Sequence, residues 1–126
     1  MLKKYLLLIA VLLTSAFYSL IASAQVGSLS AKVIRIDVTD KNIYGGCIVK
    51  LNKKVADASV PLDCPGEWVS FGCNGIFNSK DFAYHKLDLA KSALESGHDL
   101  VLTIDDFKKD NGGYCFSEGV GLTNKK

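Results

Sequence analysis

The fold of this chain is decided by residues 78–97, which read NSKDFAYHKLDLAKSALESG. Asn78 and Ser79, followed by Asp81, are typical of a helix start, with a capping side chain and an acid in the first turn. Gly97 ends the segment. Apolar residues recur between these ends at helical spacing, and we expect them to form one stripe facing the core: Ala83, Leu87, Ala90 and Leu94. Leu87 and Leu94 are therefore expected to be core residues.

Strand patterns lie on both sides of this helix. Small residues at 27–31 lead into residues 32–38, where Ile34, Ile36 and Val38 alternate with polar side chains and are expected to share one buried face. Further strands are predicted at residues 43–51 and 68–73 before the helix, and at 100–104 and 114–122 after it.

The resulting order is β-β-β-α-β-β, with the helix between the third and fourth strands. This is the layout of an OB-fold-like five-stranded barrel, so we predict a mainly β protein with one helix. Closing the sheet would also hide its edges. An open α+β sheet with the helix on one face is the alternative.

Proline, glycine and cysteine residues predict the form of two connections and of one irregular strand. Residues 52–66 hold both prolines, Pro61 and Pro65, together with Cys64, and indicate a long loop that needs a covalent tie. Residues 110–113, Asp-Asn-Gly-Gly, indicate a tight turn. Gly45 and Gly46 indicate a bulge or sharp coil within the second strand.

The beginning of the chain has the pattern of a cleaved secretory signal peptide. Lys3 and Lys4 precede an apolar run at residues 5–21, which closes on Ala22-Ser23-Ala24. A transmembrane anchor is the competing interpretation, but the run is short and interrupted by hydroxyl residues. We therefore expect residues 1–24 to be a signal peptide and residues 25–126 to form a single disulfide-stabilised domain, secreted or periplasmic and not membrane-bound.

The cysteines fit this compartment. All four lie after residue 24, an even number in an oxidising environment, so two disulfides are expected, with three pairings open: Cys47, Cys64, Cys73 and Cys115. A zinc site is the rival, but no C-x-x-C pair occurs, and His85 and His98 lack ligand spacing. We predict no metal and no cofactor.

The charge balance narrows the range of partners. The whole chain has a formal net charge of +2, but without Lys3 and Lys4 it carries 13 basic and 13 acidic side chains. Nucleic acid and anionic lipid both select concentrated Lys and Arg. Nucleic acid is therefore not an expected partner.

No catalytic constellation is evident. Thiol catalysis needs a free thiolate, which disulfides would remove, and no G-x-S-x-G nucleophile motif occurs. Asp105 and Asp106 could act as paired carboxylates or bind calcium, but before a turn they are expected to be solvated. We therefore predict that the protein is not an enzyme.

Aromatic residues suggest binding more than catalysis, because aromatic rings stack on sugars and anchor interfaces. They also fill small barrels. Trp68 is the candidate for a surface role because it opposes Val69 and Phe71 on its strand. The others are expected mainly in the core: Phe71, Tyr84, Tyr114 and Phe116.

Several segments together resemble small exported bacterial proteins similar to the B subunit of subtilase cytotoxin. The resemblance is distant, covers most of residues 25–126, and rests on the order of elements and cysteine placement. The segments are residues 46–49, 68–73 and 100–106, with the helix ending at Gly97, and Asn111-Gly112-Gly113-Tyr114-Cys115-Phe116.

The resemblance implies an OB barrel and the pairing Cys47–Cys73, which leaves Cys64 for Cys115. The toxin subunit is a pentamer that binds sialylated glycans, and Ser30 matches its sugar-contacting serine. Ile104 replaces its tyrosine and has no hydroxyl, so sialic acid specificity does not carry over.

We therefore expect an exported, non-enzymatic binding or assembly module. Its partner is a glycan or another protein, with Ser30 and Trp68 as ligand-binding candidates and a homo-oligomer as one arrangement. The alternatives are a monomeric periplasmic or secreted protein with an unknown partner, and a secreted inhibitor or chaperone-like protein acting through strand pairing or the loop at 52–66.

Overall fold

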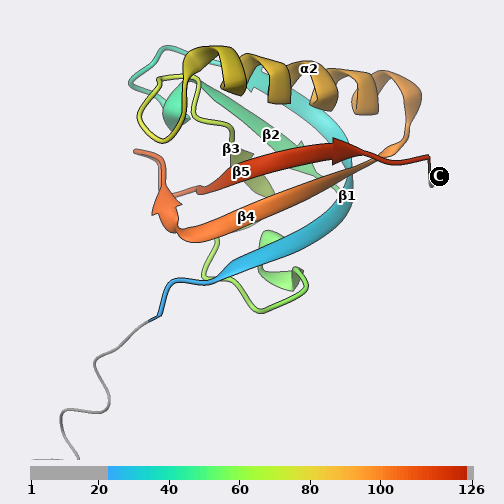
Figure 1. Cartoon of the computed structure of the whole chain (residues 1–126), viewed down its shortest axis with the longest axis horizontal. Helices are drawn as coiled ribbons and strands as arrows, with labels where there is room; N and C mark the ends of the chain where they lie inside the picture. The colour runs from blue at the N-terminus through green and yellow to red at the C-terminus, as the bar shows by residue number, and fades with distance from the viewer. Residues whose placement is uncertain (1–22, 125–126) are drawn as a thin grey trace, which may run out of the picture.

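The computed structural model describes residues 23–124. Most of the expected signal peptide therefore lies outside the described residues. Five strands and one α-helix follow in the predicted order (Figure 1), with short 3-10 turns η1 (Tyr44–Gly46) and η2 (Val55–Asp57) between them. The elements are β1 (Val26–Val38), β2 (Cys47–Leu51), β3 (Trp68–Ser70), α2 (Lys80–Ser96), β4 (Asp99–Lys109) and β5 (Cys115–Leu122).

The strands form a closed barrel in the order β1-β2-β3-β5-β4. All neighbours are antiparallel except β3 and β5, which meet in parallel at Ser70 and Phe116. Strand β1 is long enough to pair with two strands. Its first part pairs with β4 and its last part with β2. The OB-like, mainly β fold with one helix is confirmed, and the open-sheet alternative is wrong.

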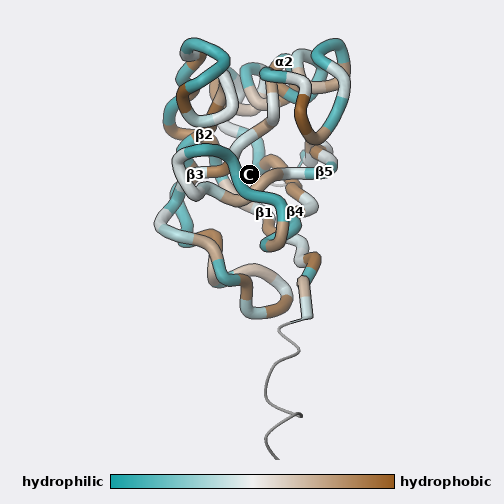
Figure 2. Tube along the Cα trace, turned by 90° about the vertical axis from the view of Figure 1, so that its left-hand side faces the viewer, coloured by the Kyte–Doolittle hydropathy of each residue, from teal (hydrophilic) through white to brown (hydrophobic). Residues whose placement is uncertain are grey.

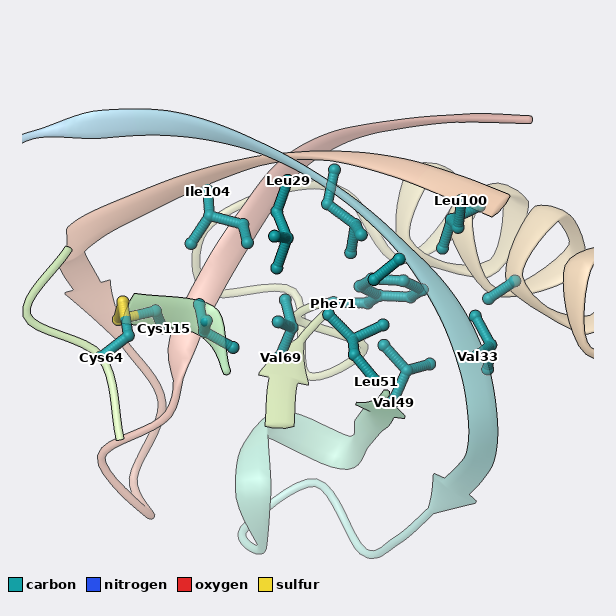
Figure 3. Close-up of a cluster of buried hydrophobic side chains, with 14 of the residues drawn as sticks. Leu29, Val33, Val49, Leu51, Cys64, Val69, Phe71, Leu100, Ile104 and Cys115 are labelled. Carbon is teal, nitrogen blue, oxygen red and sulfur yellow. A yellow bond between two sulfur atoms is a disulfide. The ribbon is translucent and has the colours of Figure 1, made fainter. Parts of the chain in front are cut away.

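The core fills the inside of this barrel. Side chains from every strand converge there (Figure 3), and Phe71, Leu51 and Leu102 are completely buried. Figure 2 shows the hydrophobic segments as short stretches interleaved with hydrophilic ones, as expected where strands alternate between the interior and the surface.

The inward face of β1 differs from the prediction. The strand begins at Val26, so the small residues expected to precede it are part of it, and Leu29, Ala31 and Val33 point into the core. The pairing register with β2 shifts between Val33 and Arg35. Such an irregularity changes which residues face inward, and Ile34 is 50% exposed instead of buried. Val38, also expected in the core, is 62% exposed.

Helix α2 has the predicted ends but a different buried face. The Ser79 side chain accepts a hydrogen bond from the Phe82 amide, and Gly97 ends the helix with a φ of 72°. The buried residues are Ala83, Lys86, Ala90 and Ala93. The expectation that Leu94 is core is wrong, because its side chain is 40% exposed. Leu87 is half-buried and packs against the core.

The small side chains of the buried alanines explain why α2 turns this face, and not its leucine face, toward the barrel. Alanines let the helix axis approach the barrel closely, whereas leucines at the same positions would hold it away. Leu87 and Leu94 instead line a shallow apolar groove of about 420 Å³ against Ile36 and Val38 of β1.

Strand β4 extends further than predicted, to Lys109. Asp105 and Asp106 are therefore strand residues and do not precede a turn. Asp106 is partly exposed, but the expectation that Asp105 is solvated is wrong. Asp105 is only 8% exposed, and its carboxylate accepts a hydrogen bond from the Phe107 amide. β2 and β3 are shorter than expected, because Tyr44–Gly46 forms η1 and the chain leaves β3 after Ser70.

Two disulfides cross-link the structure, Cys47–Cys73 and Cys64–Cys115. This is the pairing that the resemblance implied. The second bond ties the long loop to β5, and the loop packs closely on the barrel, with Val55 and Leu62 buried. It is therefore a covering segment of the barrel and not a protruding arm.

Candidate ligand-binding site

The Ser30 side chain lies among charged groups. Ser30 pairs with Val101 of β4, and its hydroxyl donates a weak hydrogen bond to Asp99 at 3.4 Å. The ammonium of Lys32 pairs with the same carboxylate at 3.2 Å, and Lys53 donates to the Ser30 carbonyl at 2.7 Å. These partners include no aromatic ring that could stack on a sugar beside Ser30.

Trp68 occupies a different surface. Its half-buried indole lies on the outer face of β2 and β3, with the Arg35 guanidinium 5.7 Å and the Lys50 ammonium 6.0 Å from the ring centroid. Each cation also has an acidic partner, Asp37 for Arg35 at 2.7 Å and Glu67 for Lys50 at 3.9 Å. Trp68 is thus a stacking surface whose flanking charges are already paired.

The structure does not bring Ser30 and Trp68 together. Trp68 pairs with Lys50, and Lys50 pairs with Arg35 of β1. Ser30 precedes Arg35 on the same strand by a stretch that spans roughly 15 Å. Ile104, the residue matched to the toxin tyrosine, is fully buried inside the barrel and has no surface to offer a ligand.

Of the other aromatic residues, Phe71 and Phe116 are core as expected. Tyr84 is not, because its side chain is 48% exposed on α2. Tyr114 is half-buried, and its ring meets that of Tyr44 edge-on, with centroids 5.5 Å apart. This pair joins two loops that are far apart in the sequence.

A hollow forms where these loops meet. The connection from β1 to β2 and the turn from β4 to β5 are joined by Asn111, whose side chain accepts a hydrogen bond from the Gly45 amide at 3.1 Å and donates one to the Asn42 carbonyl. Two adjoining clefts of about 180 and 240 Å³ share Asn42 and Asn111. We call them together the loop-end cleft. Its lining includes Lys41, Asn42, Tyr44, Asn74, Phe77 and Asn111.

The local sequence accounts for the shape of this cleft. Tyr44, Gly45 and Gly46 all have positive φ angles, 50°, 68° and 86°, which turn the chain sharply before β2. Gly112 leaves room for the Tyr44 ring, because a Cβ atom there would come within 2.3 Å of Tyr44 Cδ1. The glycines that predicted tight turns therefore also position an aromatic side chain.

Asp110 holds the second loop together. Its Oδ1 accepts hydrogen bonds from the amides of Gly112 at 2.8 Å and Tyr114 at 3.0 Å. Burial raises the pKa of this carboxyl, although these amide hydrogen bonds oppose the shift. Its Oδ2 is buried and has no partner in hydrogen-bonding geometry among the described residues. Asp110 therefore organises the turn and does not present a free carboxylate to a ligand.

The Asn42 side chain is the part of the cleft most available to a ligand. Its backbone groups are engaged with Asp40 and Asn111, but its side-chain amide makes no hydrogen bond to any other described residue. It is exposed and lies beside Tyr44, which is 39% exposed. Sequence reasoning missed this site because its parts come from separate loops. Its signals were the Asp-Asn-Gly-Gly turn and the Gly45-Gly46 pair, which predicted local bends but not that the two loops meet.

The described residues include no free thiol, no group of metal-binding side chains and no membrane-spanning helix. All four cysteines are in disulfides, so none supplies a thiolate. Within residues 23–124 no group of three or more His, Cys, Asp or Glu side chains is placed to hold a metal ion. No helix in this range has the length and apolarity needed to cross a membrane.

Comparison with known proteins adds no assignment. The chain matches no protein-family model, no curated protein and no solved structure.

Proposed function

We propose that this protein is an exported, non-enzymatic binding module that recognises a glycan in the loop-end cleft. The observation that carries the proposal is the side-chain amide of Asn42, which is exposed, makes no hydrogen bond to another described residue, and lines the same cleft as Tyr44. An amide offers both a donor and an acceptor to sugar hydroxyls. An aromatic face supplies apolar contact for the sugar ring.

The fold supports the same location. OB barrels bind oligosaccharides and oligonucleotides through the face of strands 2 and 3 and through the loops that join strands 1 to 2 and 4 to 5. Those two loops build the cleft here. The balanced charge of residues 25–126 favours a carbohydrate over a polyanionic oligonucleotide.

Trp68 gives this proposal a second contact region. It lies on the face of strands β2 and β3, where a longer ligand leaving the cleft would run. Arg35 and Lys50 beside it would favour an acidic sugar once they exchange their present carboxylate partners. Ser30 lies elsewhere on the barrel and is a separate candidate.

Export is part of the proposal. Two disulfides support an oxidising compartment, and the sequence pattern of residues 1–24 supports cleavage after Ala24. Mass spectrometry of the exported protein tests this directly. A soluble product that retains Met1 would contradict it.

A glycan array probed with the disulfide-bonded chain 25–126 is the test of binding. Any ligand found is then titrated against Asn42→Ala and Tyr44→Phe, which remove one amide and one hydroxyl from the cleft. We expect Asn42→Ala to weaken binding by about 1 kcal/mol, roughly fivefold. Thr103→Ala is the matched control, because Thr103 is exposed on β4.

Two further variants map the surface. Trp68→Ala should weaken long acidic glycans more than short neutral ones, and Ser30→Ala should leave affinity unchanged. A loss confined to Ser30→Ala would move the site to β1 and β4. Failure of the wild-type chain to bind any glycan at millimolar ligand would reject carbohydrate recognition and leave an unknown partner.

A further inference from the structure

Gln25, the residue before β1, is bound to β4 through both the carboxylate and the backbone amide of Asp106. The backbone nitrogen of Gln25 donates a hydrogen bond to Asp106 Oδ1 at 2.8 Å, and the Asp106 amide donates to the Gln25 carbonyl at 3.0 Å. Gln25 is thus clamped from both sides by one residue of β4. It is also the first residue that would remain after cleavage at Ala24.

The same carboxylate reaches the long loop. Asp106 Oδ2 accepts a hydrogen bond from the Asp63 amide at 3.2 Å, and the next residue, Cys64, is bonded to Cys115 of β5. Lys109 lies nearby and pairs with the Asp63 side chain at 3.2 Å. The hydrogen bond from Gln25 is the main cause that lowers the pKa of Asp106, so the group is a carboxylate at neutral pH.

We propose that cleavage after Ala24 turns this hydrogen bond into an ion pair between the new α-ammonium of Gln25 and Asp106, which locks the processed end of the chain onto the barrel. The inference rests on the cleavage proposed above. Before cleavage the Gln25 nitrogen is a neutral amide. Afterwards it is a cation at the same position, and charge-assisted hydrogen bonds are stronger than neutral ones.

The surroundings leave room for the charged group. Ser23 and Ala24 line a cleft of about 270 Å³ together with Asp63, Asp106, Phe107 and Lys109. Cleavage removes Ser23 and Ala24 with the residues before them and so opens this side of the cleft to solvent. The ammonium can then keep water on its remaining donors. The ion pair would form only after processing, so in the precursor this contact stays the weaker neutral hydrogen bond while the chain must still be translocated.

The ion pair should also protect the new terminus chemically. An N-terminal glutamine cyclises when its free amine attacks the side-chain carbonyl carbon, forming the N–Cδ bond, breaking the Cδ–Nε2 bond and releasing ammonia. Only the deprotonated amine attacks. A carboxylate that raises the amine pKa by one unit lowers the reactive fraction about tenfold at neutral pH.

The experiment compares disulfide-bonded chains that begin at Gln25 or at Ser23, each with Asp106 or Asp106→Asn. NMR titration of the Gln25 α-amine should give a pKa about one unit above its ordinary value of roughly 7.7–8.0, returning to that value in Asp106→Asn. Pyroglutamate formation, followed by mass spectrometry, should be about tenfold faster in Asp106→Asn. Asp63→Asn is the control, because it removes a nearby carboxylate that pairs with Lys109, whereas the Gln25 nitrogen donates to Asp106.

Thermal unfolding gives an independent readout. At pH 7 the chain that begins at Gln25 should melt about 2–5 °C above the chain that begins at Ser23, and Asp106→Asn should abolish the difference. An amine with an ordinary pKa in both backgrounds would overturn the ion pair. An exported protein that starts at another residue would instead overturn the proposed cleavage, and the NMR result tells these two failures apart.

Discussion

Lys86 donates a hydrogen bond from Nζ to the carbonyl oxygen of Ser117 at 2.5 Å, and its side chain is only 1% exposed. Its ammonium lies 4.2 Å from the ring centroid of Phe116 and within 5.5 Å of those of Phe71 and Phe82. Burial lowers the pKa of Lys86 to about 8, and the nearby charge of Glu118 opposes the shift. The barrel thus keeps a cation between α2 and β5 at a cost in stability.

This pKa leads to a pH-dependent stability. Below pH 8 both folded and unfolded chains carry the Lys86 proton, and the burial cost is complete. Between about pH 8 and the ordinary value of 10.5 only the unfolded chain keeps the proton, so the free energy of unfolding should rise with pH. The rise should total about 3 kcal/mol.

Urea unfolding of wild type and Lys86→Met from pH 7 to pH 10.5 measures this effect. Lys86→Met keeps the buried stem without the charge, so it should be more stable at pH 7 and lack this rise. Parallel curves for the two proteins would show that Lys86 does not titrate in this range.

Helix α2 should respond more to enlarging its alanines than to truncating its leucines. Leu94→Ala should lower the free energy of unfolding by less than about 1 kcal/mol because the side chain is 40% exposed. Ala90→Leu should lower it by about 1–3 kcal/mol because Ala90 is completely buried. Guanidinium unfolding of both variants tests the helix orientation, and the opposite ranking would mean that the leucine face packs inward.

Gly112→Ala should disturb the loop-end cleft. The new methyl group would overlap the Tyr44 ring, and the displaced ring should lower the free energy of unfolding by about 1–3 kcal/mol and weaken any glycan bound there. Gly119→Ala is the control, since no atom lies within 4 Å of a Cβ at that position. Equal effects of the two variants in calorimetry would argue against the close contact.

The two disulfides should contribute unequally. Replacing both cysteines of one bond by alanine should cost about 2–4 kcal/mol in each case. Cys64–Cys115 spans 51 residues and Cys47–Cys73 spans 26, so loss of the longer bridge should cost about 0.6 kcal/mol more. Chemical unfolding of the paired variants gives the order, and the reverse order would show that native packing outweighs chain entropy.

The order of strands and helix could be predicted from the sequence alone, because the signals for each element are local. The Ser79 cap, the Gly97 stop and the tight turn at residues 110–113 depend on neighbouring residues only, and all three occur as predicted. Hydrophobic alternation likewise located the strands, although their ends moved by several residues.

The inward-facing side of each element and the contacts between loops follow from long-range packing and could not be predicted from local patterns. The register shift after Val33 exposed Ile34, and close packing of α2 selected Ala90 over Leu94 for the core. Lys86 is buried because Ser117, Phe71 and Phe116 from distant segments surround it, together with Phe82 of its own helix. The loop-end cleft exists because barrel closure brings residue 42 next to residue 111. These outcomes depend on contacts between segments far apart along the chain, which no local pattern encodes.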